Sequence, residues 1–155
     1  MQLLKETRYG VRLMIALSFY YGKRTMLMQD IATRLNISKN YLEKIANKLR
    51  RAKLIVGYRG RNGGYTLSKP PCQITVGDMV RSLEERVSLT RCLSDQDACS
   101  KVKTCKMRSV WQEGERAMFT VFDSITLESL AENMDESCLA EEQTKAVPCG
   151  VLDKV

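Results

Sequence analysis

The stretch from Ile37 to Tyr65 constrains the fold more than any other part of the chain. After Ser38, a typical N-cap residue, apolar residues recur at spacings of three and four, and this pattern predicts a helix with one buried face. These apolar residues are Leu42, Ile45, Ala46 and Leu49. A glycine-rich turn between two short runs follows and predicts a β-hairpin, because glycine adopts positive φ angles easily. A helix followed by such a hairpin is typical of a winged helix-turn-helix.

The outer face of this predicted helix and the tip of the hairpin carry basic and amide side chains. Such groups can read base edges in the major groove and can hold phosphates or the minor groove. The residues that we predict to contact DNA are Ser38, Lys39, Asn40, Tyr41, Glu43, Lys44, Lys48, Arg51, Arg59 and Arg61. The alternative for this stretch alone is a solvated helix beside an ordinary hairpin. For Tyr41, as for residues 19–21, core packing is favoured over base stacking.

Charge is divided unevenly along the chain. Residues 1–70 hold 15 lysines and arginines against three acids, a balance of +12, whereas residues 71–155 hold 10 against 15, a balance of −5; together they give the net charge of +7. A basic half joined to an acidic half indicates a polyanion-binding module with a separate part that does not bind. An anionic membrane surface is the alternative, but the basic residues do not share one amphipathic helix with a bulky apolar face. We therefore predict double-stranded DNA as the partner, and no membrane.

Length and composition exclude several other classes of protein. With 155 residues the chain can form one domain with a core, or a small domain with an appendage. It has no apolar run that could cross a bilayer and no signal-peptide layout, so we expect a cytoplasmic protein. The sequence contains no histidine, and we find no nucleophile–base pattern, phosphate loop or dinucleotide motif. We therefore predict no catalytic residues and no enzymatic function.

Hydrophobic periodicity predicts further helices on both sides of this stretch. Their expected ranges are residues 6–21, 27–35, 75–85, 105–124 and 125–131, and residues 86–104 lack periodicity. Gly22 is expected to end the first helix, and Asn36 to form the turn before Ser38. The predicted fold class is thus mainly α with a small β-wing, that is, a winged helix-turn-helix plus a long dimerisation helix.

The helix predicted over residues 105–124 carries apolar residues on more than one face, among them Val110, Trp111, Val121 and Phe122. Part of this helix must therefore be covered by something other than its own small domain. A two-fold partner is the simplest solution, because DNA readers of this type bind palindromic half-sites as dimers. We predict a homodimer on a palindromic operator.

The six cysteines of a cytosolic chain point to metal, cluster or redox chemistry rather than to a disulfide framework. Cys92, Cys99 and Cys105 have the spacing C-x6-C-x5-C. Structural zinc prefers closer pairs and four ligands, and three thiols on a loop suit an iron–sulfur cluster better. By spacing alone, zinc, a redox thiol pair and unliganded cysteines remain alternatives. Cys72 is interpreted as a small packing residue or an incidental thiol, and Cys138 and Cys149 have no partner at a characteristic spacing.

Several motifs together resemble a known family. They are Leu3-x5-Tyr9, the start of the predicted recognition helix at residues 37–43, Arg59-Gly-x-x-Gly-Gly-Tyr65, the three-cysteine loop and Ile125-Thr-Leu. Over roughly residues 1–133 the chain is similar to Rrf-two-type repressors, the family of the iron–sulfur cluster regulator IscR and the nitric-oxide sensor NsrR.

The resemblance implies a homodimer with swapped long helices and a winged helix-turn-helix at each end. It further implies that Cys92, Cys99 and Cys105 hold a 2Fe–2S or 4Fe–4S cluster whose state sets the affinity for DNA. By the same similarity, Asn40, Glu43 and Lys44 would face bases and Arg59 the minor groove. The domains implied are a winged helix-turn-helix over residues 1–71, a cluster-binding loop with the dimerisation helix over residues 72–133, and a mobile tail over residues 134–155.

The chain departs from this family at the remaining cluster ligand. The first cysteine gap is one residue longer than is usual, and Arg108 stands where the IscR branch has a histidine. Arg8 occupies the position of the aspartate ligand of the NsrR branch, which leaves Glu6 as the candidate fourth ligand. Other candidates are Cys138, Cys149, a small thiol or an open iron position.

These features lead to a repressor that senses iron–sulfur status or oxidative or nitrosative stress. The alternative is a regulator of the same fold without a cluster, controlled by cysteine oxidation or by a protein partner. A small electron-transfer protein is a third possibility, but such a protein would not need the basic half or the hairpin.

Overall fold

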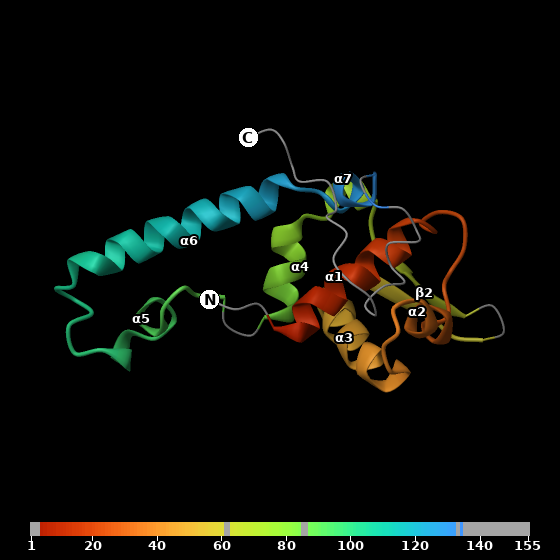
Figure 1. Ribbon diagram of the computed structural model, residues 1–155, viewed down its shortest axis with the longest axis horizontal. Coiled ribbons are helices and arrows are strands. Elements are labelled where there is room, and N and C mark those ends of the chain that lie inside the picture. The colour runs from red at the N-terminus through yellow and green to blue at the C-terminus, as the bar shows by residue number, and fades with distance from the viewer. Residues whose placement is uncertain (1–3, 61–62, 85–86, 133, 135–155) are drawn as a thin grey trace, which may run out of the picture.

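The computed structural model describes residues 4–60, 63–84, 87–132 and 134, whose arrangement is shown in Figure 1. These residues are mainly helical and include a two-stranded antiparallel sheet. In chain order the elements are α1 (Lys5–Ser18), α2 (Met28–Arg34), α3 (Lys39–Arg51), β1 (Ile55–Tyr58), β2 (Gly64–Leu67), η1 (Pro71–Gln73), α4 (Val76–Leu83), α5 (Arg91–Ser94), η2 (Gln96–Ala98), α6 (Lys106–Ser124) and α7 (Leu127–Glu132).

Helix α3 forms where the sequence predicts it, and its apolar stripe is fully buried. Leu42, Ile45 and Leu49 have no exposed surface. Ser38 stands at the N-cap with an extended backbone, as expected of its residue type, but its side chain makes no capping hydrogen bond. Its backbone carbonyl alone accepts hydrogen bonds, from the amides of the first turn of α3. Asn36 forms the preceding turn with a φ of 50°, a left-handed conformation that asparagine tolerates.

The hairpin predicted after α3 is the β1–β2 wing. Ile55 pairs with Leu67 at its base and Tyr58 with Gly64 near its tip. Met26 adds a bridge on the outer edge of β2, with backbone bonds to Tyr65 of 2.9 and 2.8 Å. Gly64 has a φ of 142°, and a Cβ atom there would lie 2.6 Å from the Met26 carbonyl oxygen. The glycine therefore permits both the backbone conformation and the close approach of Met26.

The core forms where α1, α3 and α4 meet, with α2 packed against α3. Gly10 of α1 allows a close approach of the two helices, since a Cβ atom there would lie 2.3 Å from Leu83 Cδ1. In α4, Met79, Val80 and Leu83 are buried and Val76 is half-buried. Ile74 and Leu127 belong to the same core cluster, so the packing continues beyond residue 71.

Two parts of the chain differ from the prediction by more than two residues. Helix α1 ends at Ser18, three residues before the predicted end, because the chain then tightens into turns bonded from Tyr20 to Leu17 and from Tyr21 to Ser18. Gly22 lies in these turns with a φ of 73° and does not itself end the helix. Residues 86–104, predicted to lack regular structure, contain the short helices α5 and η2.

Helix α6 agrees with the long helix predicted from the sequence and projects away from the winged-helix unit (Figure 1). It packs on α4 and on α5, and the segment that carries the cysteines runs beside it. Met134, the first residue of the predicted tail, packs against the core, and the rest of the tail lies outside the described residues. No helix in the described part of the chain combines the length and the apolar character of a membrane span.

Candidate nucleic-acid interface and cysteine segment

A groove of about 580 Å³ runs between the recognition helix α3, the N-terminal end of α2 and the wing. From the predicted set it gathers Lys39, Glu43 and Arg59. Lys39 and Glu43 form an ion pair of 3.8 Å across one helical turn, as residues four apart can. The groove therefore has basic and hydrogen-bonding groups on its helix side and an arginine on its wing side.

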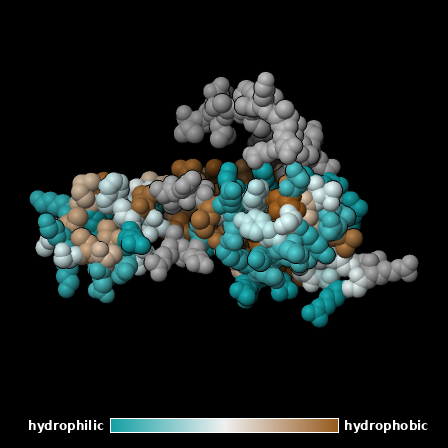
Figure 2. Space-filling view, turned by 60° about the horizontal axis from the view of Figure 1, so that its bottom comes forward, coloured by the Kyte–Doolittle hydropathy of each residue, from teal (hydrophilic) through white to brown (hydrophobic). Residues whose placement is uncertain are grey.

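The outward surface of α3 carries four more of the predicted DNA contacts. Ser38 is exposed at its N-terminal end, and Asn40, Lys44 and Arg51 are exposed along the helix. Figure 2 turns the bottom of Figure 1, where α3 lies, toward the viewer, and this side of the winged-helix unit is largely hydrophilic. A polar, basic helix of this kind can enter a major groove and form hydrogen bonds with base edges.

Tyr41 and Lys48 lie on a different side of α3, toward α1. Tyr41 is half-buried and packs edge-on against Tyr9, with ring centroids 6.0 Å apart. Burial raises the pKa of the Tyr41 hydroxyl, and the Glu6 carboxylate adds to this effect. Lys48 Nζ forms an ion pair with Glu6. The interpretation of Tyr41 as a packing residue is confirmed, as it is for residues 19–21.

The wing contributes Arg59, which is exposed just after β1. Arg61, the second predicted wing arginine, lies outside the described residues. The sequence reasoning missed Arg50, which lines the groove together with Lys39 and Glu43. The helical period could have found it, because Arg50 follows Glu43 by seven residues and therefore lies on the same face.

A second hollow, of about 850 Å³, lies on the other side of α2 and reaches the wing at Gly63. Two of its arginines stack on Tyr20, with Arg24 4.5 Å and Arg34 5.5 Å from the ring centroid. Asp30 also lines this hollow, so it is less basic than the groove beside α3. Its position could not be predicted from spacing, since it depends on how α2 packs against the wing.

The three cysteines of the predicted cluster site all lie in the segment between α4 and α6. Cys92 is half-buried in α5, Cys99 is exposed after η2, and Cys105 is exposed at the N-cap of α6. Cys92 Sγ lies 3.2 Å from the Thr90 hydroxyl, and Arg108 donates to the Cys92 carbonyl oxygen at 3.3 Å. Within the described residues, no three side chains of His, Cys, Asp or Glu come together as a metal site.

The remaining residues named as possible ligands lie apart from this segment or outside the described ranges. Glu6 is paired with Lys48 at the start of α1, and Arg8 is exposed on the same helix. Cys138 and Cys149 lie outside the described residues. Cys72 is exposed in η1, so its interpretation as a packing residue is wrong, whereas an incidental thiol agrees with this position.

Helix α6 exposes an apolar surface near its N-terminal end. Met107, Val110 and Trp111 follow one another at spacings of three and one, which places them on one side of the helix, and they are 51%, 55% and 41% exposed. Val121, three turns further along, is 55% exposed. Surface of this kind marks an interaction site more often than a solvated face.

Comparison with known proteins agrees with this geometry. The family model of Rrf2, described as an iron-dependent transcriptional regulator, matches residues 3–133. Protein rrf2 of Nitratidesulfovibrio vulgaris is 34% identical over 130 residues, which are 84% of this chain and 87% of that protein.

Two solved structures share the fold. One is CymR, the global cysteine regulator of B. subtilis, with a TM-score of 0.71, 34% identity and coverage of 87% of this chain and 99% of that one. The other is IscR of T. potens, with a TM-score of 0.68, 30% identity and coverage of 92% and 94%. These likenesses confirm the predicted fold class, and a family of regulators agrees with the prediction of no enzymatic function. The chain therefore belongs to the Rrf2 family of DNA-binding transcriptional regulators.

Proposed function

We propose that this regulator is a homodimeric repressor whose affinity for a palindromic operator is set by an iron–sulfur cluster on Cys92, Cys99 and Cys105. The observation that carries the proposal is the position of the three thiols. They share one segment of 14 residues, between the helix that packs on the DNA-reading unit and the helix with the exposed apolar face. A change in this segment can therefore act on both parts of the molecule.

The chemistry of the donor set fits a cluster, because thiolates are its usual ligands. Two of the three thiols are exposed, and all three are free. The segment holds them apart, however, so binding requires the residues between Cys92 and Cys105 to draw together. The short helices α5 and η2 have few residues to rearrange. When bound, an iron–sulfur cluster supplies a redox-active centre.

We assign DNA reading to residues 1–71. The residues that would face the major groove from α3 are Ser38, Asn40, Lys44 and Arg51. Lys39 and Glu43 would lie at the edge of this groove. Arg59 and Arg61 of the wing would contact the minor groove or the phosphates. Tyr41 and Lys48 also belong to this predicted set, from the side that faces α1. Residues 72–133 would supply the cysteine segment and the dimer helix, and residues 134–155 a tail. Because a DNA-binding regulator must share a compartment with the DNA, we propose a cytoplasmic location.

The apolar side of α6 supports the dimer. Burying Met107, Val110 and Trp111 against the same surface of a second copy would form an isologous interface and leave a reading unit at each end. Operator control then requires the two states of the cysteine segment to differ in their affinity for DNA. Converting an operator from 99:1 bound to 99:1 free takes a differential of about 5.5 kcal/mol between the two states.

The decisive experiment is anaerobic purification followed by a visible spectrum and an iron count. We expect a coloured, iron-containing wild type, an equally coloured Cys72→Ala control, and a colourless triple Cys92/Cys99/Cys105→Ala variant. A duplex selected from a random library by the wild type then serves as the probe. Equal wild-type affinity for this duplex with and without iron and sulfide would refute cluster control.

A second candidate is control by cysteine chemistry without a cluster, and similarity to CymR, named as a cysteine regulator, favours considering it. The free thiols of Cys99 and Cys105 are exposed and accessible to an oxidant. In this case the purified protein would be colourless and iron-free. Its affinity for the duplex would fall on oxidation and recover with a thiol reductant, and it would not respond to iron and sulfide.

A further inference from the structure

The attachment of α6 to the winged-helix unit is concentrated near one end of the helix. Its C-terminal part packs on α4, while the other end extends beyond the unit beside the cysteine segment (Figure 1). A helix of 19 residues is about 28 Å long. Because a helix of this length is held near one end, a small change in its angle there produces a large displacement of its other end. A tilt of 10° at the attachment would move its far end by about 5 Å.

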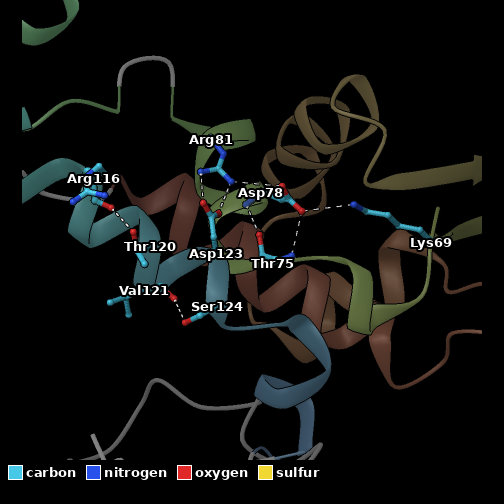
Figure 3. A network of polar contacts seen from close by, with 9 residues as sticks. All are labelled: Lys69, Thr75, Asp78, Arg81, Arg116, Thr120, Val121, Asp123 and Ser124. Carbon is cyan, nitrogen blue, oxygen red and sulfur yellow. Dashed lines mark hydrogen bonds and ion pairs between the residues drawn. The ribbon is translucent and has the colours of Figure 1, made fainter. Parts of the chain in front are cut away.

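A single side chain of α4, that of Arg81, contacts two successive turns of α6 at this attachment. Arg81 donates from Nη2 to Asp123 Oδ1 at 2.5 Å and from Nη1 to Oδ2 at 3.3 Å (Figure 3). Its guanidinium also lies over the ring of Phe119, 4.9 Å from the centroid. Because Phe119 precedes Asp123 by one helical turn, these two contacts restrain the direction of α6 as well as its position.

Gly77 allows the Asp123 carboxylate to lie directly against α4. A Cβ atom at Gly77 would be 1.8 Å from Asp123 Oδ1 and 2.9 Å from Arg81 Nη2. Glycine is a poor helix former, so its presence inside α4 is accounted for by this close approach. A Cβ atom at this position would overlap the Asp123 carboxylate, so Asp123 would have to leave the position in which it accepts from Arg81.

The same end of α6 is held from a second side by backbone bonds. Val76 N–H donates to the Ile125 carbonyl oxygen at 2.9 Å, and Leu127 N–H to that of Ile74 at 2.7 Å. The N-terminus of α4 is itself fixed by a capping box between Thr75 and Asp78. Asp78 Oδ1 in turn lies 3.7 Å from Arg81 Nη2, and Asp78 Oδ2 lies 3.6 Å from Nζ of Lys69, two residues after the last residue of β2 (Figure 3). The joint is thus connected to the wing on one side and to α6 on the other.

We propose that Arg81, Asp123 and Gly77 form a positioning joint that sets the angle of α6 and thereby the separation of the two recognition helices. This inference rests on the proposed dimer through α6. Both side chains of the ion pair are 45% exposed, and exposed pairs contribute little to folding stability. A shift of about 5 Å at the dimer end, in contrast, exceeds the 3.4 Å rise of one base pair. The joint is therefore expected to affect half-site spacing more than stability.

The test measures affinity against half-site spacing. The probes are the duplex selected by the wild type, the same duplex with one base pair inserted or deleted between its half-sites, and a duplex with a single half-site. We expect the wild type to bind the selected spacing at least tenfold more tightly than the altered ones. In Arg81→Ala and Gly77→Ala this preference should fall to about threefold or less, with single half-site affinity and melting temperature unchanged. Arg81→Lys, which keeps the charge, should give an intermediate profile.

Arg116→Ala is the matched control, because it removes an exposed Arg–Glu pair that lies entirely within α6. It should keep the wild-type profile. Spin labels introduced through an unnatural amino acid at Asn47 provide a readout without DNA: the distance distribution between the two recognition helices should broaden in Arg81→Ala and Gly77→Ala only.

Unchanged spacing profiles in both joint variants would overturn the inference, as would equal flattening in Arg116→Ala. Unfolding of Arg81→Ala would contradict a role limited to positioning. If the wild type selects no duplex, the proposed function fails, and the label distances alone then decide whether the joint exists.

Discussion

At the scale of single residues, Arg59 is the described wing arginine with the clearest expected role. It is exposed beside the groove that also contains Lys39 and Glu43. We expect Arg59→Ala to weaken binding to the selected duplex by roughly 1–3 kcal/mol, because a specific DNA contact of arginine is lost. Arg116→Ala, on α6, is the control and should leave the affinity unchanged. Fluorescence anisotropy with selected and random duplexes measures the effect, and equal discrimination by Arg59→Ala and wild type would remove Arg59 from the reading set.

Lys48 illustrates what residue type alone cannot determine. In the sequence it is one of several lysines on the polar side of a helix, and Lys44 has the same character. In the structure Lys48 forms an ion pair with Glu6, whereas Lys44 points to solvent. The partner of Lys48 is 42 residues away in the sequence. Helical periodicity cannot foresee a contact between two separate helices, since it describes each helix by itself.

At the scale of elements, the wing depends on a glycine at one particular position. Gly64 and Gly60 both have positive φ angles, 142° and 109°, but only a Cβ at Gly64 would meet backbone, 2.6 Å from the Met26 carbonyl oxygen. Gly60→Ala should therefore cost backbone strain alone. We expect Gly64→Ala to lower the free energy of unfolding by roughly 1–3 kcal/mol more than Gly60→Ala does, because Gly64→Ala must also break the bridge to Met26. Urea unfolding and hydrogen exchange at the Tyr65 amide measure this difference, and equal losses in the two variants would contradict it.

Helix α6 makes the second prediction at this scale. Val110→Asp would place a charge in the expected dimer interface, where it would be desolvated without a partner. We expect the dimer dissociation constant to rise at least tenfold, about 1.4 kcal/mol, by sedimentation equilibrium. Gln112→Asp adds the same charge on another side of the same helix and should leave the dimer intact. A monomeric wild type, or equal dissociation of both variants, would contradict this interface.

The elements that sequence could predict are those determined by local pattern. Helix α3, the wing and α6 follow from apolar spacing and from glycines, which act within a few residues. The end of α1 and the short helices among the cysteines lack such a pattern and were mispredicted. The groove and the joint of Arg81 with Asp123 need the packing of separate elements. The spacing of Cys92, Cys99 and Cys105 predicts a shared segment, but it carries no information on how far apart the thiols stand in it.

At the scale of the whole molecule, the uneven charge and the fold divide the chain in the same way. The excess of +12 lies in residues 1–70, which include α3 and the wing, whereas residues 87–124, with the cysteine segment and α6, hold six basic and five acidic residues, a balance of +1. A long-range field of this kind attracts DNA to the strongly basic end of each protomer rather than to the nearly neutral end that carries α6. In a dimer through α6, both basic ends would remain free for the two half-sites.

This division makes a prediction about salt dependence. Each phosphate contact contributes about −0.9 to the slope of log K against log salt concentration, because binding releases a condensed counterion. Lys44→Ala removes one positive charge from the exposed surface of α3 in each protomer, so a dimer would release about two fewer counterions and its slope should become shallower by about 2. Lys101→Ala removes the same exposed charge from the cysteine segment and should leave the slope unchanged. Titrations of the selected duplex at several salt concentrations measure both slopes. If the two variants change the slope equally, DNA is held by the overall charge of the molecule rather than by the surface of α3.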